Sequence, residues 1–194
     1  MSDERVMRLF TPEEYLMIEL DAPLRSEYDN GRIYAMAGAS DNHAFIVENI
    51  VGNLYPQLRK TDCRSTTHDI KVKPTKSKAY YYPDVIVRCG KKVVANDDQG
   101  ILLNPFSIFE VLSPATESYD CVVKYNRYLE IESLQDYIMV SQNALQVEHH
   151  SKNEEGEWTC RILTRLTDKL TLKGAPASLT LEDIYERIEI APLD

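Results

Sequence analysis

Two carboxylates stand inside apolar sequence in the middle of the chain, and they are the residues best placed to do chemistry. Asp84 follows Pro83 and directly precedes the apolar run Val85–Val87, and Glu110 lies inside the apolar sequence SIFEVL. An ionised carboxylate is costly to bury without a partner, so each acid needs a cation, a metal ion or hydrogen bonds. Backbone amides or a buried lysine or arginine would satisfy either acid alone, so the sequence leaves these alternatives open.

The two acids considered together favour a metal site. If their strands are neighbours in one sheet, the carboxylates lie close together and repel each other at pH 7, unless one is protonated or a cation lies between them. Oxygen-rich sites of this kind suit Mg²⁺, which binds one or two carboxylates, water and a substrate phosphate. We therefore expect Asp84 and Glu110 to converge on one divalent cation, Mg²⁺ or Mn²⁺.

The elements that would position these acids are two strands, at residues 81–89 and 106–113. Their continuous apolar character predicts central strands that are covered on both faces. Residues 63–74 also resemble a strand, in which Ile70 and Val72 alternate with Lys71 and Lys73. Shorter strands, broken by polar turns, are expected at residues 136–142, 145–152, 157–164 and 169–174.

Helices and a hairpin complete the predicted fold. Thr11 is expected to cap a helix that runs to about Leu20, and Asn30-Gly31 predicts a two-residue hairpin turn. Further helices are expected after Asn42, from Thr116, and after a cap at Thr180. The helix after Asn42 would bury one face, made of Phe45, Ile46, Ile50, Val51, Leu54 and Leu58. We expect an α+β fold, with a mixed sheet flanked by helices, in a single domain over residues 1–194.

Charge is unevenly distributed along the sequence. The chain has 194 residues and a formal net charge of −9, which argues against loose attraction to nucleic acid. Residues 59–92 nevertheless carry ten Lys and Arg against three Asp and Glu. This basic segment is either a surface that faces phosphates or the solvated edge of a sheet. The neighbouring Tyr80, Tyr81 and Tyr82 could stack on bases. Tyrosine is also a favoured strand residue, and we prefer this structural interpretation.

Composition also limits the cellular setting and the metal chemistry. The four cysteines lie far apart, so we expect free thiols in or near the core, and we expect no zinc site from them. His149 and His150 point to opposite faces of one strand, so they cannot serve one metal there. No apolar run approaches the length needed to cross a bilayer, and the first residues do not resemble a signal peptide. A cytoplasmic protein with no membrane contact is expected.

An ordered set of motifs resembles one bacterial family. TPEEYLMIEL, RSEYDNGRIYAMAGAS, HDIKVK, YPDVIV, FEVLSPAT, YDCVVKYNRYLEIESLQDYIMVSQ and VEHH occur in this order and span nearly the whole chain. Together they resemble the Uma-two family of restriction-endonuclease-like proteins, within the PD-(D/E)XK nuclease superfamily. The resemblance implies a restriction-endonuclease-like central mixed sheet with helices on both sides. It also implies a metal-dependent endonuclease that hydrolyses phosphodiester bonds of DNA.

The resemblance assigns roles to particular residues. It implies that Asp84 and Glu110 are the two metal-binding acids and that Glu27 adds to the metal shell. As part of our own hypothesis, we expect the carbonyl of Val111 to join them in holding the ion. The superfamily motif expects a lysine two positions after the second acid, where this chain has Leu112. The residue that matches the family pattern instead is Lys124, in the helix expected from Thr116.

The sequence gives Lys124 a mixed setting. Val122, Tyr125 and Leu129 define an apolar face of that helix, so Lys124 is expected roughly opposite, facing solvent or a polar cleft. Asp120 and Tyr128, four residues to either side, would share its face. Lys71 is the second candidate for the catalytic lysine.

Supporting roles and other functions remain open. Ser113 could bond a metal-bound water or a phosphate, or it could cap the following turn. His43 could contact the site, or it could be an ordinary half-buried histidine. A catalytically inactive nuclease-fold module for DNA binding or assembly is the alternative function, and an RNA-directed nuclease is a third. Since cutting both DNA strands commonly needs two related active sites, we expect a homodimer.

Overall fold

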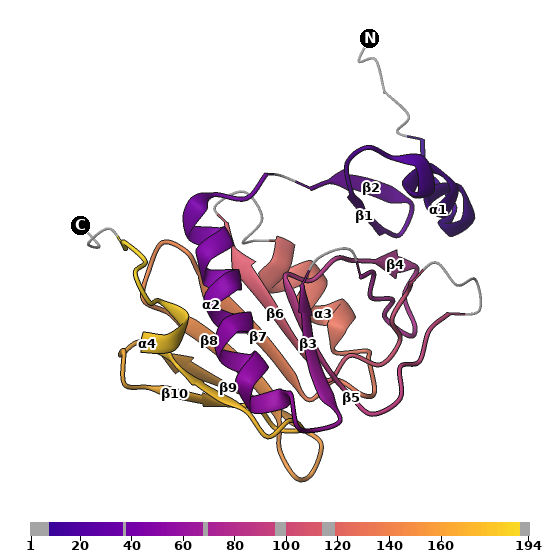
Figure 1. Cartoon of the computed structure of the whole chain (residues 1–194). Coiled ribbons are helices and arrows are strands. Elements are labelled where there is room, and N and C mark those ends of the chain that lie inside the picture. Colours follow the sequence, from indigo (N-terminus) through magenta and orange to yellow (C-terminus); the bar gives the residue numbers. More distant parts are fainter. Residues whose placement is uncertain (1–7, 37, 68–69, 96–99, 114–118, 191–194) are drawn as a thin grey trace.

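The protein is built on a six-stranded mixed sheet flanked by helices (Figure 1). The structure is a computed structural model that describes residues 8–36, 38–67, 70–95, 100–113 and 119–190. β6 and β7 pair in parallel and every other neighbouring pair in this sheet is antiparallel. In spatial order the strands are β3 (Cys63–Thr67), β5 (Val85–Cys89), β6 (Ser107–Leu112), β7 (Asp136–Ser141), β8 (Val147–Lys152) and β9 (Trp158–Leu163).

The strands that carry the predicted acids are central. All six residues of β6 are buried, and β5 is buried over its first three. The long helix α2 (Asp41–Leu58) crosses one face of the sheet, and α3 (Tyr125–Tyr128) lies on the other (Figure 1). One apolar cluster forms between the sheet and α2, and a second forms beneath α3. The continuous apolar character of these two strands is thereby explained, because both faces of the sheet are covered.

Helix α2 is held by the apolar stripe that its sequence predicted. Ser40 caps it by accepting a hydrogen bond from the backbone N–H of His43 at 3.2 Å. Burial of each such side chain stabilises the fold by about 1.5–3 kcal/mol relative to exposure to water. The buried residues of this helix are Ile46, Val47, Ile50, Leu54 and Leu58. Phe45, predicted to share this face, is instead 52% exposed, because at about 3.6 residues per turn it lies on the side of the helix away from the buried stripe.

The N-terminal residues form most of a small lobe that consists of one helix and a three-stranded sheet separate from the main sheet. Helix α1 (Pro12–Asp21) begins with the predicted capping box between Thr11 and Glu14. β1 (Ser26–Asp29) and β2 (Arg32–Ala35) form the predicted hairpin, and the short β4 (Ala79–Tyr80) pairs with β1. Asn30 and Gly31 have φ of 46° and 95°, which is the pair of positive values that a type I′ turn requires.

Tyrosines fill the interior of this lobe and its border with the sheet. The ring of Tyr15 stacks on those of Tyr28 and Tyr80, with centroids 5.1 and 5.6 Å apart. Tyr80, Tyr81 and Tyr82 are all buried. They therefore serve the core, as preferred from the sequence, and do not present their rings to nucleic acid.

The C-terminal part closes the α2 side of the sheet. β10 (Lys169–Thr171) and β11 (Ser178–Thr180) form a two-stranded sheet, followed by α4 (Leu181–Ile184). Thr180 caps α4 as predicted, in a capping box with Asp183, although the helix is only one turn long.

The helix that carries Lys124 differs from an ordinary α-helix. Tyr119–Lys124 forms a π-helical segment, η1, and only Tyr125–Tyr128 continues as α3. The predicted start at Thr116 lies outside the described residues. π-Helical turns are rare and occur frequently at functional sites.

Two expectations from the sequence are wrong. Cys63 and Cys89 are directly opposite each other in the β3–β5 ladder and form a disulfide, so they are not free thiols. Lys71 does not alternate outward, because residues around Val72 make isolated bridges and no regular strand, and Lys71 is buried. Within the described part of the chain, no helix is long and apolar enough to span a membrane.

Candidate functional site

Most of the residues singled out from the sequence meet in one pocket of about 400 Å³. It lies where the N-terminal lobe, the first turn of α2, the start of β5, the end of β6 and η1 come together. Its polar lining consists of Glu27, Tyr34, Ser40, His43, Tyr82, Asp84, Glu110, Ser113, Tyr119, Asp120, Lys124 and Gln142.

Asp84 stands at the point where β5 begins, and its carboxylate is held from two sides. The ladder pairs Val85 with Phe109, so one further step places Asp84 opposite Glu110. Oδ2 of Asp84 accepts a hydrogen bond from the backbone N–H of Val111 at 2.8 Å, and Oδ1 lies 3.1 Å from Nε2 of His43. The side chain keeps 15% exposure, so Asp84 is a partly open acid at the pocket wall.

Lys124 lies at the centre of three acids from three separate segments. Its Nζ is 3.0 Å from Glu27 Oε1, 3.0 Å from Asp120 Oδ1 and 3.4 Å from Glu110 Oε1. All four side chains are less than one-tenth exposed. Because these acids come from β1, β6 and η1, one ammonium joins the N-terminal lobe to the sheet.

Lys124 faces a polar cleft, which is one of the two settings expected from the sequence, but the apolar face expected for its helix is wrong at Val122. Asp120 and Tyr128 do share its side, and the hydroxyl of Tyr128 donates to Glu110 Oε1 at 3.1 Å. However, this side is the buried one, and Val122, assigned to the apolar face, is 58% exposed. The prediction assumed α-helical geometry, whereas the wider turn of η1 rotates each side chain away from its α-helical direction.

Burial and charge determine the protonation of this cluster. Burial lowers the pKa of Lys124, but the surrounding Glu110, Glu27 and Asp120 outweigh it and raise that pKa well above its ordinary value. Burial raises the pKa of Glu110 well above the usual carboxyl range and raises that of Glu27, although Lys124 opposes both shifts. The surrounding acids therefore favour the charged ammonium form of Lys124.

The pKa of His43 is shifted by burial and by the neighbouring Asp84. Burial lowers its pKa, but the hydrogen bond to Asp84 and the negative charges of Asp84 and Asp120 outweigh burial and raise it overall. With Nε2 directed at the carboxylate, the imidazole must carry its proton on that nitrogen. Histidine in such a position can give or take a proton during a reaction.

The donor chemistry of the pocket fits a divalent cation. Glu27, Asp84, Glu110 and Asp120 supply four carboxylates against the single positive charge of Lys124, which leaves a formal charge of −3 when all are ionised and His43 is neutral. Carboxylate oxygens are the ligands that Mg²⁺ and Mn²⁺ prefer. The ammonium nevertheless holds the acids apart. Within the described residues, none of the acids in this pocket belongs to a set of three possible ligand atoms within 4.8 Å of one another.

Other predicted residues are placed as follows. Ser113 lines the pocket, and part of the turn that it was alternatively expected to cap lies outside the described residues. Val111 lines it too, and its backbone N–H is engaged by Asp84. Lys71 is not part of the pocket lining, and its Nζ lies 5.9 Å from the centre of the Tyr82 ring.

Two contributors were not assigned a role from the sequence. Asp120 forms an ion pair with Lys124, and Tyr128 binds Glu110. The signal that could have found both is their spacing of four residues on either side of Lys124, which places a carboxylate and a hydroxyl beside the lysine on a helix.

The six-stranded mixed sheet flanked by helices is an α+β fold that a solved structure shares. A solved structure described as "a putative nuclease belonging to DUF820 from Anabaena variabilis ATCC 29413" has this fold, with a TM-score of 0.76 over 91% of this chain and 98% of that one at 15% identity. The chain belongs to the Uma2 family, described as "Putative restriction endonuclease", whose model matches residues 12–182.

Two proteins of Synechocystis sp. (strain ATCC 27184 / PCC 6803 / Kazusa) are similar in sequence over most of their length. The protein named slr1290 is 33% identical over 175 residues, which is 90% of each chain. The protein named sll1609 is 31% identical over 159 residues, covering 82% of this chain and 88% of its own. Both are described as uncharacterized proteins.

Proposed function

We propose that the protein is a DNA endonuclease that hydrolyses phosphodiester bonds and depends on Mg²⁺ or Mn²⁺. The observation that carries the proposal is the gathering of four carboxyl groups in one pocket, three around the ammonium of Lys124 and the fourth, Asp84, beside His43. A site with uncompensated carboxylates is costly unless a cation joins it. The family's description supports the same reaction class.

Each residue has a role that its surroundings favour. Asp84, Glu110 and Glu27, together with the carbonyl of Val111, would hold the ion. The bound ion would supply a water of lowered pKa and neutralise charge that builds on the phosphate. Lys124, whose charged form its acids favour, would stabilise negative charge on the phosphoryl oxygens while the attacking water loses a proton. His43 is the group that can exchange that proton.

Plasmid cleavage tests the proposal directly. We expect nicking or linearisation with Mg²⁺ or Mn²⁺ and none with chelator. Asp84→Asn and Glu110→Gln should each lower the rate by about 100-fold or more, because a metal ion contributes several kcal/mol to the transition state. Glu48→Gln, on the exposed side of α2, is the matched control and should cleave like the native protein. Metal-independent cleavage, or equal cleavage by Asp84→Asn, would contradict the proposal.

A second function is favoured by one specific observation. The ammonium of Lys124 occupies the centre of the acid cluster, and the position two after Glu110 holds the buried Leu112. These features suit a module that keeps the fold for DNA binding or assembly without the chemistry. Calorimetric titration with Mn²⁺ separates the two. Heat that disappears in Asp84→Asn supports the nuclease, whereas no metal-dependent heat with DNA binding in chelator supports the inert module.

Substrate and assembly follow from the same proposal. Paired assays with DNA and RNA of one sequence distinguish a DNA nuclease from an RNA nuclease. Cutting of both DNA strands commonly uses two active sites related by a two-fold axis, so we propose a homodimer of two-fold symmetry. Light scattering at micromolar concentration should give twice the chain mass, and a monomer would refute the dimer.

A further inference from the structure

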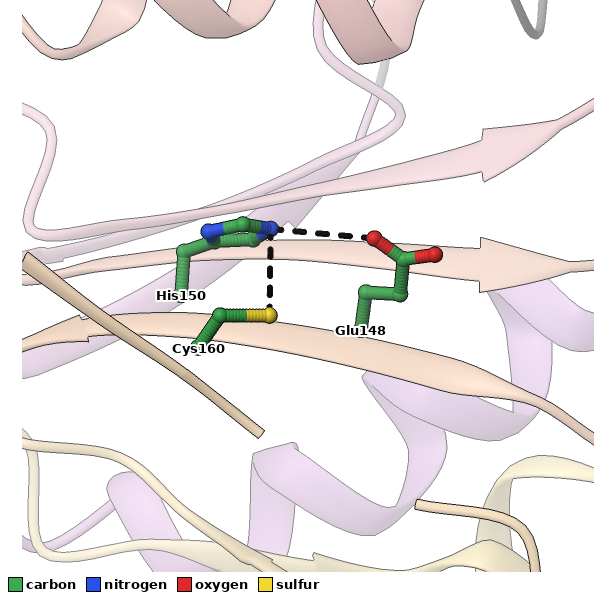
Figure 2. A group of neighbouring side chains, drawn as sticks. All are labelled: Glu148, His150 and Cys160. Atoms are coloured by element: carbon green, nitrogen blue, oxygen red, sulfur yellow. Dashed lines mark hydrogen bonds and ion pairs between the residues drawn. The ribbon is translucent and has the colours of Figure 1, made fainter. Parts of the chain in front are cut away.

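A second group of ligand-type side chains lies on β8 and β9, outside the pocket. Glu148, His150 and Cys160 lie together, with their functional atoms directed toward one another (Figure 2). Glu148 and His150 are two residues apart on β8 and so point to one face of the sheet. Cys160 is directly opposite His150 in the β8–β9 ladder, which places its side chain on that face too.

Two of the three spacings between the functional atoms are close to the edges of a tetrahedron around zinc. Sγ of Cys160 lies 3.6 Å from Nε2 of His150, and this nitrogen lies 3.8 Å from Oε2 of Glu148. The three possible ligand atoms lie within 4.8 Å of one another. Zinc bonds of about 2.0–2.3 Å place tetrahedral ligands about 3.3–3.8 Å apart. Little movement is therefore needed to bring all three atoms onto one ion.

Neighbouring groups hold two of these side chains in place. The amide of Gln146 donates from Nε2 to Glu148 Oε1 at 3.2 Å, which leaves Oε2 facing the histidine. The ring of Tyr125 from α3 lies against the imidazole of His150, with centroids 4.7 Å apart. Such outer contacts orient metal ligands and reduce the cost of ordering them.

Access and chemistry separate this cluster from the acid pocket. Cys160 is exposed, and Glu148 keeps 30% of its side chain in solvent, so an ion can enter from water. None of the three lines the pocket that contains Glu110. Glu110 on β6 pairs with Met139 on β7, which in turn pairs with Glu148 on β8. The two sites are therefore two strand spacings apart, or about 10 Å across the sheet.

We propose that Glu148, His150 and Cys160 form a Zn²⁺ site with three protein ligands and a fourth position open to water. A thiolate, an imidazole and a carboxylate suit zinc, whereas Mg²⁺ and Mn²⁺ prefer an all-oxygen shell. The site joins β9, whose four central residues are exposed, to β8. Bound zinc therefore cross-links the edge strand β9 to β8, and this role does not depend on whether the protein is a nuclease.

Cobalt spectroscopy tests the site without any assay of activity. Co²⁺ is added to the whole chain under anaerobic conditions without reductant, so that the disulfide between Cys63 and Cys89 stays closed. One equivalent should produce a thiolate-to-cobalt charge-transfer band, and Zn²⁺ should abolish this band by displacement. Competition with a chromophoric chelator then gives the zinc affinity.

Variants assign the ligands. Cys160→Ser should remove the band, and His150→Gln should weaken zinc binding by more than the roughly 10–100-fold that loss of an outer contact costs. Cys121→Ser, which changes the other described cysteine outside the disulfide, should retain both properties. Asp84→Asn should also retain them, which separates this result from the fate of the nuclease proposal. No band in the native chain, or a band that persists in Cys160→Ser, would overturn the inference.

Discussion

Replacing Lys124 by methionine should destabilise the protein strongly, because three buried acids lose their common cation. Each of the contacts at 3.0, 3.0 and 3.4 Å has a Coulomb attraction of about 5 kcal/mol at an effective dielectric constant of about 20. Desolvation of the charges and repulsion between the acids offset most of this attraction. The net loss on removing one partner of a buried ion pair is about 3–5 kcal/mol, which we expect for Lys124→Met at pH 8.

The expected loss depends on pH in a defined direction. Burial already raises the pKa values of Glu110 and Glu27, and loss of the ammonium removes the attraction that opposes this shift. A folded state with raised carboxyl pKa values binds more protons than the unfolded chain, so its stability falls as the pH rises through those values. The penalty for Lys124→Met should therefore be smallest in acid and largest at alkaline pH.

Urea unfolding of the native protein and Lys124→Met at several pH values measures this penalty. Lys169→Met, on an exposed position of β10, is the matched control and should change the free energy of unfolding by less than about 0.5 kcal/mol. Mn²⁺ should restore part of the lost stability if the acids accept a divalent ion, since a ligand that binds only the folded state stabilises it. A variant as stable as the native protein at pH 8 would refute the electrostatic reasoning.

Three further predictions concern other parts of the structure. Glu27→Gln keeps an acceptor for the N–H of Tyr82 but loses the charge, so it should raise the Mn²⁺ concentration needed for half-maximal cleavage. The pKa of His43 is raised in the folded state, so its protonation stabilises the fold. This contribution is fully present below the pKa of the unfolded chain, near 6.5, and is lost as the pH rises through the pKa of the folded protein. His43→Gln should remove this pH dependence from unfolding curves taken between pH 5.5 and 8.5. The Cys63–Cys89 disulfide joins residues 26 positions apart, so opening it should lower the free energy of unfolding by about 3.5 kcal/mol through loop entropy. Dithiothreitol should therefore destabilise the native chain and leave the stability of Cys63→Ser unchanged.

The sequence predicted those features that depend on local rules. Thr11 and Glu14 form their capping box because the bonds lie within one turn, and Asn30-Gly31 forms its turn because few other pairs tolerate two positive φ angles. The central position of β5 and β6 also followed, because a continuous apolar strand must be covered on both faces.

Features that depend on partners far along the chain were missed or reversed. The burial of Lys124 is set by Glu27 and Glu110, which no helical periodicity can anticipate, and by the π-helical turn of η1. The disulfide depends on the register of β3 against β5. The cluster around His150 depends on which residue of β9 lies opposite it, since spacing along the chain brings no cysteine near.

The hairpin of the N-terminal lobe has a consequence that reaches well beyond its turn. Glu27 is paired with Tyr34, and both side chains line the pocket, whereas the next pair, Tyr28 and Ile33, packs into the aromatic interior of the lobe. Side chains of a strand alternate between faces, so a slip of one residue would exchange the acid for a tyrosine. Insertion or deletion of a residue at Gly31 would thus change which side chains line the pocket while leaving every acid of the sequence in place.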